Sequence, residues 1–173
     1  MVKKIRLLGY GEDALTLWAV TERLDLILEE LGDDSDPADC TVFYRPSFGR
    51  RGLYGEFDAI IVTPMKAYLV ESKWSGLLRP TKSSIKLRDE QITRHEILAW
   101  YHRNWKGEDW DEFAEENDSK FRERFPGKYI PLSRTGGGKT ILVQNLKTVL
   151  NFIRGQEAKE PPDLLPQRRA TGD

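Results

Sequence analysis

The sequence predicts an α/β domain, in the form of a sandwich of helices around a mixed central sheet. Apolar residues recur at helical spacing near the start of the chain and again in its second half. Between these regions, residues 41–46 and 56–73 are rich in valine, isoleucine and aromatic side chains and are bounded by glycine or proline, as strands are. Helix, strands and further helices in this order fit that class of fold.

Five apolar residues at helical spacing predict the first helix, from about residue 12 to residue 31, with Gly32 as its end; they are Leu17, Val20, Leu24, Ile27 and Leu31. Residues 41–46 follow as a strand, and a glycine-rich basic loop covers residues 47–55. Residues 56–73 form two strands around a tight turn at residues 63–66. The rest is predicted as helices over about residues 85–105, 108–125 and 145–154, a short strand over 129–132 and a β-favouring run over 140–144.

Two helix positions support these boundaries. Asn145 is a suitable N-cap for the last helix, and Gly155 would end it. The helix over 108–125 places four aromatic residues on one stripe, and these are expected to lie in the core; they are Trp110, Phe113, Phe121 and Phe125. A dimer interface is the alternative for some of the five tryptophans of the chain.

Composition limits the class of protein. The chain has 173 residues, of which 39% are hydrophobic and 32% are charged, so it can form one domain that buries about two-thirds of its unfolded surface. We expect this domain over residues 1–156 and a disordered tail over residues 157–173, where proline and charge occur without periodicity. Cys40 is the only cysteine, which excludes an internal disulfide, a multi-cysteine zinc site and an iron–sulfur cluster.

Hydropathy favours a cytoplasmic protein without a membrane partner. No apolar run in the sequence approaches the roughly 20 residues that cross a bilayer. The basic N-terminus is followed by an apolar stretch that is far too short for a secretory signal.

Three glycines at residues 136–138, followed by Lys139 and Thr140, have some likeness to a nucleotide-binding P-loop. The first glycine of that motif would fall at Ser133, and a β-favouring run follows Thr140 where the motif needs a helix. A flexible hairpin turn explains the glycines better, and no nucleotide cofactor is expected.

Three charged residues stand out in the predicted hairpin over residues 56–73. Asp58 lies early on its first strand, and Glu71 and Lys73 end its second strand. Alternation along a strand directs Glu71 and Lys73 to one face and Ser72 to the other, and the turn would bring Asp58 beside them. Both strands are otherwise apolar, where charge is costly. An ordinary surface hairpin with a Glu/Lys pair is the alternative.

Two carboxylates and one ammonium suit a metal-dependent phosphodiesterase. A hard cation polarises the phosphoryl oxygen and activates water, and magnesium takes oxygen ligands. We therefore expect Asp58 and Glu71 to bind Mg²⁺ or Mn²⁺, with Ser72 counted among the ligands and a backbone carbonyl and waters completing the shell. Lys73 would orient the attacking water or offset charge in the transition state.

With Asp58, Glu71 and Lys73 on this hairpin, the chain resembles the PD-(D/E)xK nuclease superfamily, which includes restriction enzymes and archaeal Holliday-junction resolvases. The resemblance covers roughly residues 9–105 and implies a three-layer α/β/α, restriction-endonuclease-like fold. It implies that Asp58, Glu71 and Lys73 are catalytic. Phe57 stands where the family has a proline before the aspartate.

The same resemblance implies two further site residues. Gly9-Tyr10-Gly11-Glu12 is similar to the start of the first helix in resolvase and nuclease-related members, which implies that Glu12 is a third catalytic acid that binds the metal with Asp58 and Glu71. Its alternative is an acidic residue favoured by the helix dipole. Gln91, on one helical stripe with His95, would hydrogen-bond the attacking water or a phosphate, and Arg94 or His95 would contact the nucleic-acid backbone. A solvated helix face is the alternative.

Basic residues are concentrated in the middle of the chain. Residues 45–94 carry ten Lys or Arg and five Asp or Glu, whereas the remainder carries 17 and 23. Because phosphate contacts supply most nonspecific affinity for nucleic acids, this asymmetry favours a polyanionic partner. For any one of these basic residues, the alternative is that it lies on a solvated loop and binds no partner. The flanking residues expected to bind nucleic acid are Arg45, Arg50, Arg51, Arg79 and Lys82.

Together these patterns predict a divalent-metal-dependent endodeoxyribonuclease that hydrolyses DNA phosphodiester bonds. No separate recognition domain is visible, which favours selectivity for DNA structure over a long sequence. The alternatives are a noncatalytic nucleic-acid-binding or assembly module that keeps the nuclease fold, and an RNA-processing nuclease. Many enzymes of this fold act as dimers because a duplex has two strands to cut, and the sequence leaves dimerisation open.

Overall fold

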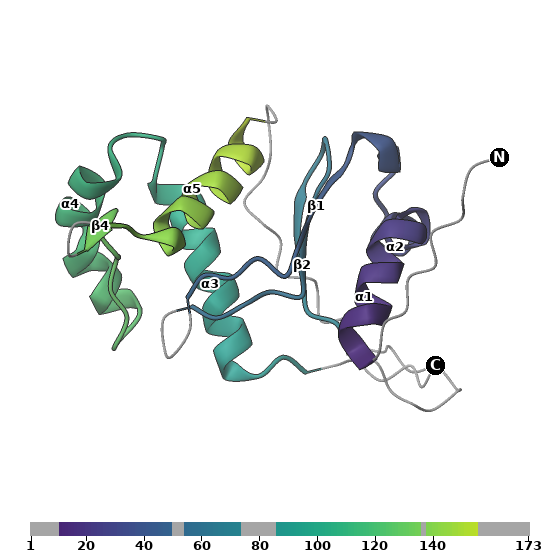
Figure 1. Cartoon of the computed structure of the whole chain (residues 1–173), viewed down its shortest axis with the longest axis horizontal. Helices are drawn as coiled ribbons and strands as arrows, with labels where there is room; N and C mark the ends of the chain where they lie inside the picture. Colours follow the sequence, from purple (N-terminus) through teal and green to yellow (C-terminus); the bar gives the residue numbers. More distant parts are fainter. Residues whose placement is uncertain (1–10, 50–53, 74–85, 136–137, 156–173) are drawn as a thin grey trace, which may run out of the picture.

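The computed structural model describes residues 11–49, 54–73, 86–135 and 138–155, and these form a mixed α/β fold (Figure 1). Five α-helices, one 3₁₀ helix and five strands follow one another along these residues. Their order is α1 (Gly11–Glu22), α2 (Leu24–Leu31), η1 (Pro37–Asp39), β1 (Thr41–Tyr44), β2 (Ala59–Val62), β3 (Ala67–Val70), α3 (Asp89–Asn104), α4 (Trp110–Arg124), β4 (Arg134–Thr135), β5 (Gly138–Lys139) and α5 (Ile141–Arg154). The α/β class is therefore confirmed. The predicted tail over 157–173 lies outside the described residues.

The central sheet has the order β1-β2-β3, with β2 antiparallel to both neighbours. The predicted turn between β2 and β3 is confirmed, because Thr63 N donates to the carbonyl of Lys66 at 2.8 Å. The Thr63 hydroxyl also accepts hydrogen bonds from the backbone amides of Met65 and Lys66. Every pairing among the described strands is antiparallel, so the mixed sheet expected from the sequence is not seen in this part of the chain.

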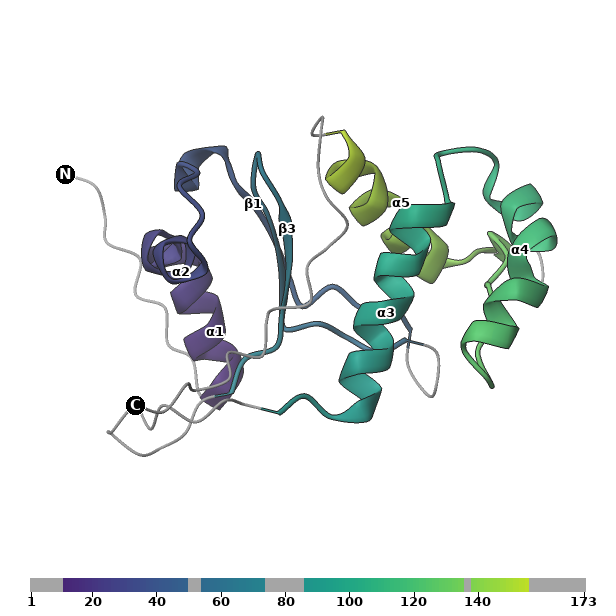
Figure 2. The same cartoon turned by 180° about the vertical axis from the view of Figure 1, so that it is seen from behind.

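Helices cover both faces of this sheet (Figures 1 and 2). On one face, Leu24 and Leu28 of α2 pack against Ile61 and Tyr68. On the other face, Ile60 and its neighbours join a larger cluster with α3, α4 and α5. All four residues of β2 are buried, as expected for a central strand covered on both sides.

The first two predicted helices have different boundaries in the structure. The single helix expected over residues 12–31 is two helices, which meet at Arg23 (φ −137°). No glycine or proline stands at this break, so the sequence gives no local signal for it. Gly32 does end α2, in the left-handed conformation (φ +67°), as predicted. The predicted helix over 85–105 begins four residues later, at Asp89.

The last helix, α5, begins at Ile141 and has Thr140 as its N-cap residue, so the N-cap predicted at Asn145 is wrong. Residues 141–144 look β-favouring because isoleucine and valine are common in strands. Their helical spacing with later apolar residues decides the outcome, since Leu142, Val143 and Leu146 are all buried on one face of α5. The short strand predicted over 129–132 is absent from the described residues.

Strands β4 and β5 pair antiparallel, with Thr135 opposite Gly138, which agrees with the predicted hairpin turn. A helix nevertheless follows Thr140, so one of the two reasons given against a P-loop is wrong. The other reason, Ser133 in place of the first glycine, stands.

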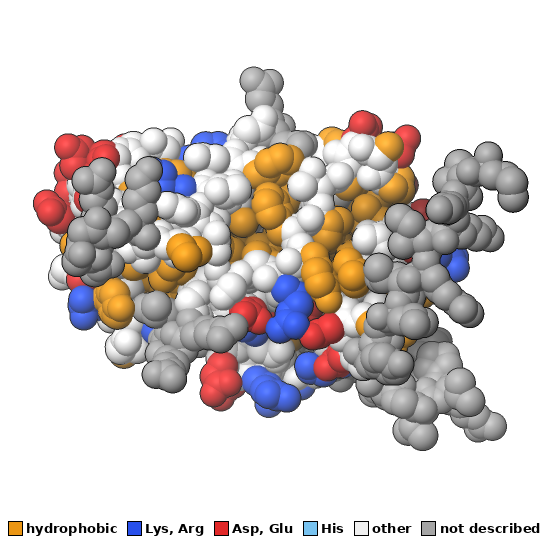
Figure 3. Space-filling view, viewed as in Figure 1, with side chains coloured by type: hydrophobic (Ala, Val, Ile, Leu, Met, Phe, Trp, Pro, Cys, Tyr) orange, Lys and Arg blue, Asp and Glu red, His pale blue; other side chains and the backbone are white. Residues whose placement is uncertain are grey.

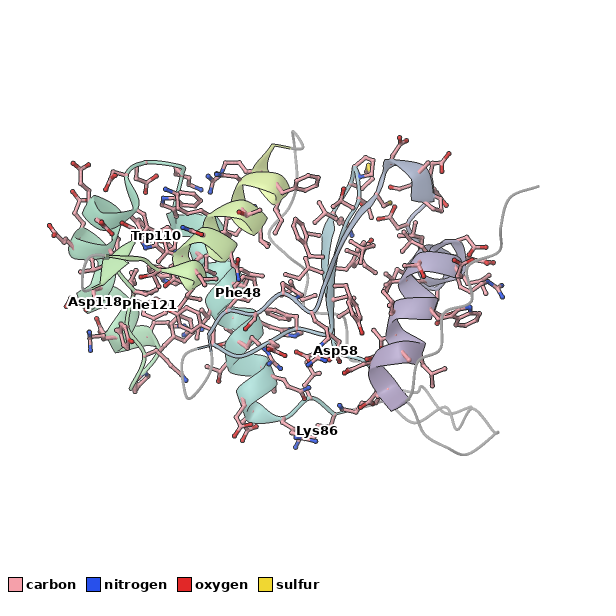
Figure 4. The ribbon with its side chains drawn as sticks, viewed as in Figure 1. Phe48, Asp58, Lys86, Trp110, Asp118 and Phe121 are labelled. Atoms are coloured by element: carbon pink, nitrogen blue, oxygen red, sulfur yellow. The ribbon has the colours of Figure 1, made fainter. Side chains whose placement is uncertain are left out.

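The aromatic stripe predicted on residues 108–125 forms the core between α3 and α4, as Figure 4 shows for Trp110 and Phe121. Trp110 is 1% exposed and Phe121 is 0% exposed. Two buried hydroxyl groups in this region are paired, since those of Tyr54 and Tyr101 lie 2.7 Å apart. No helix among the described residues combines the length and apolar character that a membrane span requires.

Candidate functional site

The candidate site lies at the end of the sheet where β2 begins and β3 ends. Asp58 directly precedes β2 and Glu71 directly follows β3. Ala59 pairs with Val70 in the sheet, so Asp58 and Glu71 come next to each other in the same register. The N-terminal half of α1 and the first half of α3 reach this end of the sheet from its two sides (Figure 4).

A kink in the chain directs Asp58 and Glu71 to different sides. Arg45, opposite Asp58, has φ +49°, a conformation that is uncommon for a residue other than glycine. Phe57 and Ile60 both belong to the larger core cluster, although residues three apart in a regular strand face opposite ways. The alternation is therefore broken before β2, and Asp58 turns toward α1.

Asp58 is held by Ser72. Its Oδ2 atom accepts a hydrogen bond from Ser72 N at 2.7 Å and another from Ser72 Oγ at 3.0 Å. Ser72 Oγ also lies 2.7 Å from Oγ1 of Thr16, which is 3% exposed and donates to the carbonyl of Glu12. Asp58 is thus connected through two hydroxyl groups to the first turn of α1.

Glu71 turns the other way and is held by α3. Its Oε2 atom accepts a hydrogen bond from Gln91 Nε2 at 2.8 Å, and its Oε1 atom accepts one from Arg94 Nη2 at 2.7 Å. His95 Nε2 lies 3.4 Å from Oε1. The ring nitrogens of His95 have no hydrogen-bond partner within the described part of the chain. The orientation of the Glu71 carboxylate is therefore set mainly by its hydrogen bonds with Gln91 and Arg94.

Glu71 is an ionised carboxylate in a nearly closed environment, since only 5% of its side chain is exposed. Burial by itself raises the pKa of Glu71, but its contacts with His95, Arg94 and Gln91 outweigh that effect and hold the pKa below its ordinary value. The carboxylate therefore stays charged at neutral pH.

Gln91 has a defined orientation because both ends of its amide are used. Its Oε1 atom accepts a hydrogen bond from the backbone N–H of Arg88 at 3.0 Å, while its Nε2 atom donates to Glu71. Gln91 and His95 are 9% and 1% exposed. Their stripe on α3 is therefore buried against the sheet, and the alternative of a solvated helix face is wrong.

Lys73 and Glu12 lie on the solvent side of the site. Nζ of Lys73 is 4.0 Å from Oε1 of Glu12, with 39% and 45% of these side chains exposed. An exposed pair at that distance contributes little stability. The structure therefore brings Glu12 close to the Glu71–Lys73 segment, but Lys73 faces α1 while Glu71 faces α3.

The carboxylates retain some capacity for a metal ion. The described residues contain no group of three or more His, Cys, Asp or Glu side chains placed to hold a metal. Each carboxylate oxygen has two acceptor positions. Oδ1 of Asp58 receives no hydrogen bond from the residues that the structure describes, and Oε2 of Glu71 receives only that of Gln91. Both are hard oxygen donors of the kind that magnesium or manganese takes, but Asp58 faces α1 and Glu71 faces α3, so the described arrangement does not gather them around one ion.

The predicted nucleic-acid-binding residues are placed unequally. Arg45 bridges Asp13 (2.5 Å) and Glu56 (3.0 Å), and tethers α1 to the segment before β2. Arg94 contacts Glu71, and His95 is buried beside it. Arg50, Arg51, Arg79 and Lys82 lie outside the described residues. Figure 3 shows basic side chains next to acidic ones at this end of the molecule, so the described surface here is mixed in charge.

The sequence reasoning missed the ion pair between Arg94 and Glu71. Arg94 follows Gln91 by three residues, so both lie on one helical face. This spacing was a usable signal. The hydroxyl groups of Thr16 and Ser72 were missed as a connection between α1 and Asp58, because their contact joins residues 56 positions apart.

Comparison of this chain with protein-family models, curated proteins and solved structures finds no match. The residues of this chain and their geometry therefore carry the functional argument alone.

Proposed function

We propose that this protein is a divalent-metal-dependent endodeoxyribonuclease with a restriction-endonuclease-like fold, of the PD-(D/E)xK type. One observation carries the proposal: the five predicted catalytic residues, which come from four separate segments, gather at one end of the sheet. The contacts that link these segments are Glu12 with Lys73, Ser72 with Asp58 and Thr16, and Glu71 with Gln91. Helices on both faces of the sheet support the three-layer sandwich.

Each residue has a role in the proposed reaction. The proposed ligands of Mg²⁺ or Mn²⁺ are Asp58 and Glu71, and to share one ion the two side chains would have to turn toward each other from opposite sides. The metal would supply Lewis-acid activation of the phosphodiester when it is bound. Lys73, which is 39% exposed, can reach solvent and a bound phosphate, where its ammonium group would offset negative charge. Gln91 keeps Glu71 in a fixed orientation, and Glu12 is the third acid of the proposed site, 4.0 Å from Lys73.

A noncatalytic nucleic-acid-binding module is the second candidate, and one observation favours it. Arg94 already neutralises Glu71 in a nearly buried ion pair, as in a structural network that has no metal. The same network would also keep the strand ends in place for binding alone. Catalysis and binding therefore need separate measurements.

The proposed function is tested by cleavage of plasmid, single-stranded and branched DNA, and of RNA, with Mg²⁺, with Mn²⁺ and with EDTA. The informative variants are Asp58→Asn and Lys73→Ala, and Lys120→Ala on the exposed side of α4 is the matched control for the lysine. We expect metal-dependent cleavage of DNA, loss of at least about a hundredfold in rate for the first two variants, and normal cleavage by the control.

Full cleavage by Asp58→Asn or Lys73→Ala would refute the catalytic assignment. Tight DNA binding without cleavage under any metal condition would instead establish the binding module. Cleavage restricted to RNA would identify the RNA-processing alternative.

A further inference from the structure

We propose that basic side chains at the C-terminal end of α3 and on the outer side of α5 form a second nucleic-acid contact, which binds backbone phosphates away from the strand ends. We call Arg103, Lys106, Lys147 and Arg154 the α3–α5 cluster. The inference rests on the proposed function in taking DNA as the partner. It assigns the cluster to binding and leaves the chemical step to the candidate site.

The two segments that carry the cluster contain no acidic residue. Residues 97–107, which include the second half of α3, hold Arg103 and Lys106 but no Asp or Glu, and residues 138–155, which include α5, also lack them. Polar residues three or four positions apart form one stripe on α5, separate from its buried apolar face; they are Gln144, Lys147, Asn151 and Arg154. The positive charge on this stripe is therefore not offset on its own helix.

Packing brings the two segments together at Trp105, the buried residue that follows α3. The Nη2 atom of Arg154 donates a hydrogen bond to the carbonyl of Trp105. Cζ of Arg154 lies 5.1 Å and Nζ of Lys147 lies 6.0 Å from the centroid of the Trp105 ring. Figures 1 and 2 both show α5 crossing the C-terminal half of α3. The two cations of α5 are thus held beside the end of α3.

The surroundings of His102 show that charges from both segments act at one place. The pKa of His102 lies below its ordinary value, first because burial disfavours its charged form, and then because Arg154, Lys106 and Arg103 place positive charge beside it. Three of the four cations of the cluster are therefore close enough to act on the same imidazole. Like charges gathered in this way repel each other, and a bound anion would relieve that repulsion.

The cluster also lacks the acidic partners that other cations of this chain have. Arg45, Arg94 and Arg122 form ion pairs with carboxylates. No ion pair within the described ranges involves a member of the cluster. The acid nearest to Lys106 along the chain is Glu108, and its Oε2 atom accepts a hydrogen bond from the backbone N–H of Lys106 at 2.6 Å. The positive charge of the cluster is thus available to a partner.

The residue types on α5 favour a phosphate backbone over a membrane surface. The amides of Gln144 and Asn151 are exposed on the same stripe as the cations, and amide, ammonium and guanidinium N–H groups are donors to phosphate oxygens. A helix that binds a bilayer buries apolar side chains in it. Phe152, an exposed apolar residue of α5, instead packs edge-on against Phe43 of β1, with 5.5 Å between the ring centroids.

The cluster is separate from the candidate site. His102 follows Gln91 by eleven residues on α3, which is about 16 Å at 1.5 Å per residue. A phosphate contact at that distance adds affinity and salt dependence but does not touch the reacting bond. We therefore expect the cluster to affect the KM for DNA and not kcat.

The test measures binding of a fluorescently labelled DNA duplex to the full chain in EDTA, by anisotropy at several salt concentrations. The cluster variant combines Arg103→Gln, Lys106→Gln and Lys147→Gln, and it keeps Arg154 because this side chain contacts the backbone of Trp105. The matched control removes the same charge from three other exposed positions; it combines Arg23→Gln, Lys120→Gln and Arg124→Gln.

We expect the cluster variant to bind at least about tenfold more weakly, with the salt dependence reduced by about one unit of slope for each cation removed. The control is expected to stay within about threefold of wild type. A charge-keeping variant, with Arg103→Lys, Lys106→Arg and Lys147→Arg, should also bind within about threefold of wild type, because phosphate attraction depends on charge.

Three results would overturn the proposal. Equal losses in the cluster variant and the control would show an effect of net charge alone. Unchanged DNA binding by the cluster variant would exclude the contact. Binding of wild type, but not of the cluster variant, to phosphatidylserine vesicles, with equal DNA binding by both, would assign the cluster to a membrane.

The cluster and the nuclease fail separately. In cleavage assays with Mg²⁺ or Mn²⁺, the cluster variant is expected to keep kcat within about threefold while KM rises about tenfold, and a loss confined to kcat would overturn the assignment to binding. Cluster-dependent DNA binding without cleavage under any metal condition would refute the nuclease and leave the cluster standing. Metal-dependent cleavage with an unchanged KM in the cluster variant would do the reverse.

Discussion

The ion pair between Arg94 and Glu71 predicts a large, non-additive effect on stability. The two charges are 2.7 Å apart, with 14% and 5% of their side chains exposed. At an effective dielectric constant of about 20, unit charges about 4 Å apart attract by roughly 4 kcal/mol. Removal of one partner of a buried pair costs about 3–5 kcal/mol, because the other charge stays buried without compensation.

The experiment is a double-mutant cycle in EDTA. We expect Arg94→Gln to lower the free energy of unfolding by about 3–5 kcal/mol, a large part of the total of about 5–15 kcal/mol for a domain. The double variant with Glu71→Gln should be more stable than Arg94→Gln alone, because two neutral amides can hydrogen-bond without a buried charge. A coupling energy of about 2 kcal/mol is expected for groups in direct contact.

Urea unfolding followed by tryptophan fluorescence measures the four free energies. The matched cycle uses Arg124 and Glu96, which lie 3.8 Å apart with side chains 64% and 39% exposed. That exposed pair is expected to show no measurable coupling. Effects of Arg94→Gln and Glu71→Gln that add within about 0.5 kcal/mol would show that the two groups do not depend on each other, and would refute the reasoning.

Three further predictions follow from the same contacts. Ser72→Ala should lower the free energy of unfolding by about 1–3 kcal/mol, because it removes the hydroxyl group that donates to Asp58. Urea unfolding measures this loss, and an unchanged free energy would contradict the prediction. Gly55→Ala should destabilise more than Gly127→Ala, since both have positive φ but a Cβ atom meets another side chain only at Gly55; equal losses would contradict the close approach. The pKa of Glu71 lies below its ordinary value of 4.5 in the folded state, so its contribution to stability is complete above about pH 4.5 and is lost as pH falls through the folded pKa. Wild type should therefore lose more stability than Glu71→Gln between pH 6 and pH 3 in urea titrations, and parallel losses would exclude this contribution.

The sequence by itself determined the elements that carry the site. Runs of β-favouring apolar residues and helical apolar spacing predicted the hairpin of β2 and β3, its turn at residues 63–66 and the aromatic core of α3 and α4. These features depend on neighbours close in the chain, where periodicity and turn chemistry suffice. The same local rules failed at Ile141, because a run of β-favouring residues also fits a helix when its apolar spacing continues.

Only the tertiary structure decided how the charged residues of the hairpin are arranged. Strand alternation predicted Asp58 beside Glu71 and Lys73, but that alternation is broken before β2, where Arg45 opposite Asp58 has the left-handed conformation. Asp58 consequently contacts Ser72, while Glu71 pairs with Arg94, 23 residues away. The physical reason is that the period of a strand holds only while the strand stays regular, and an ion pair between distant residues forms only when helix and sheet pack together.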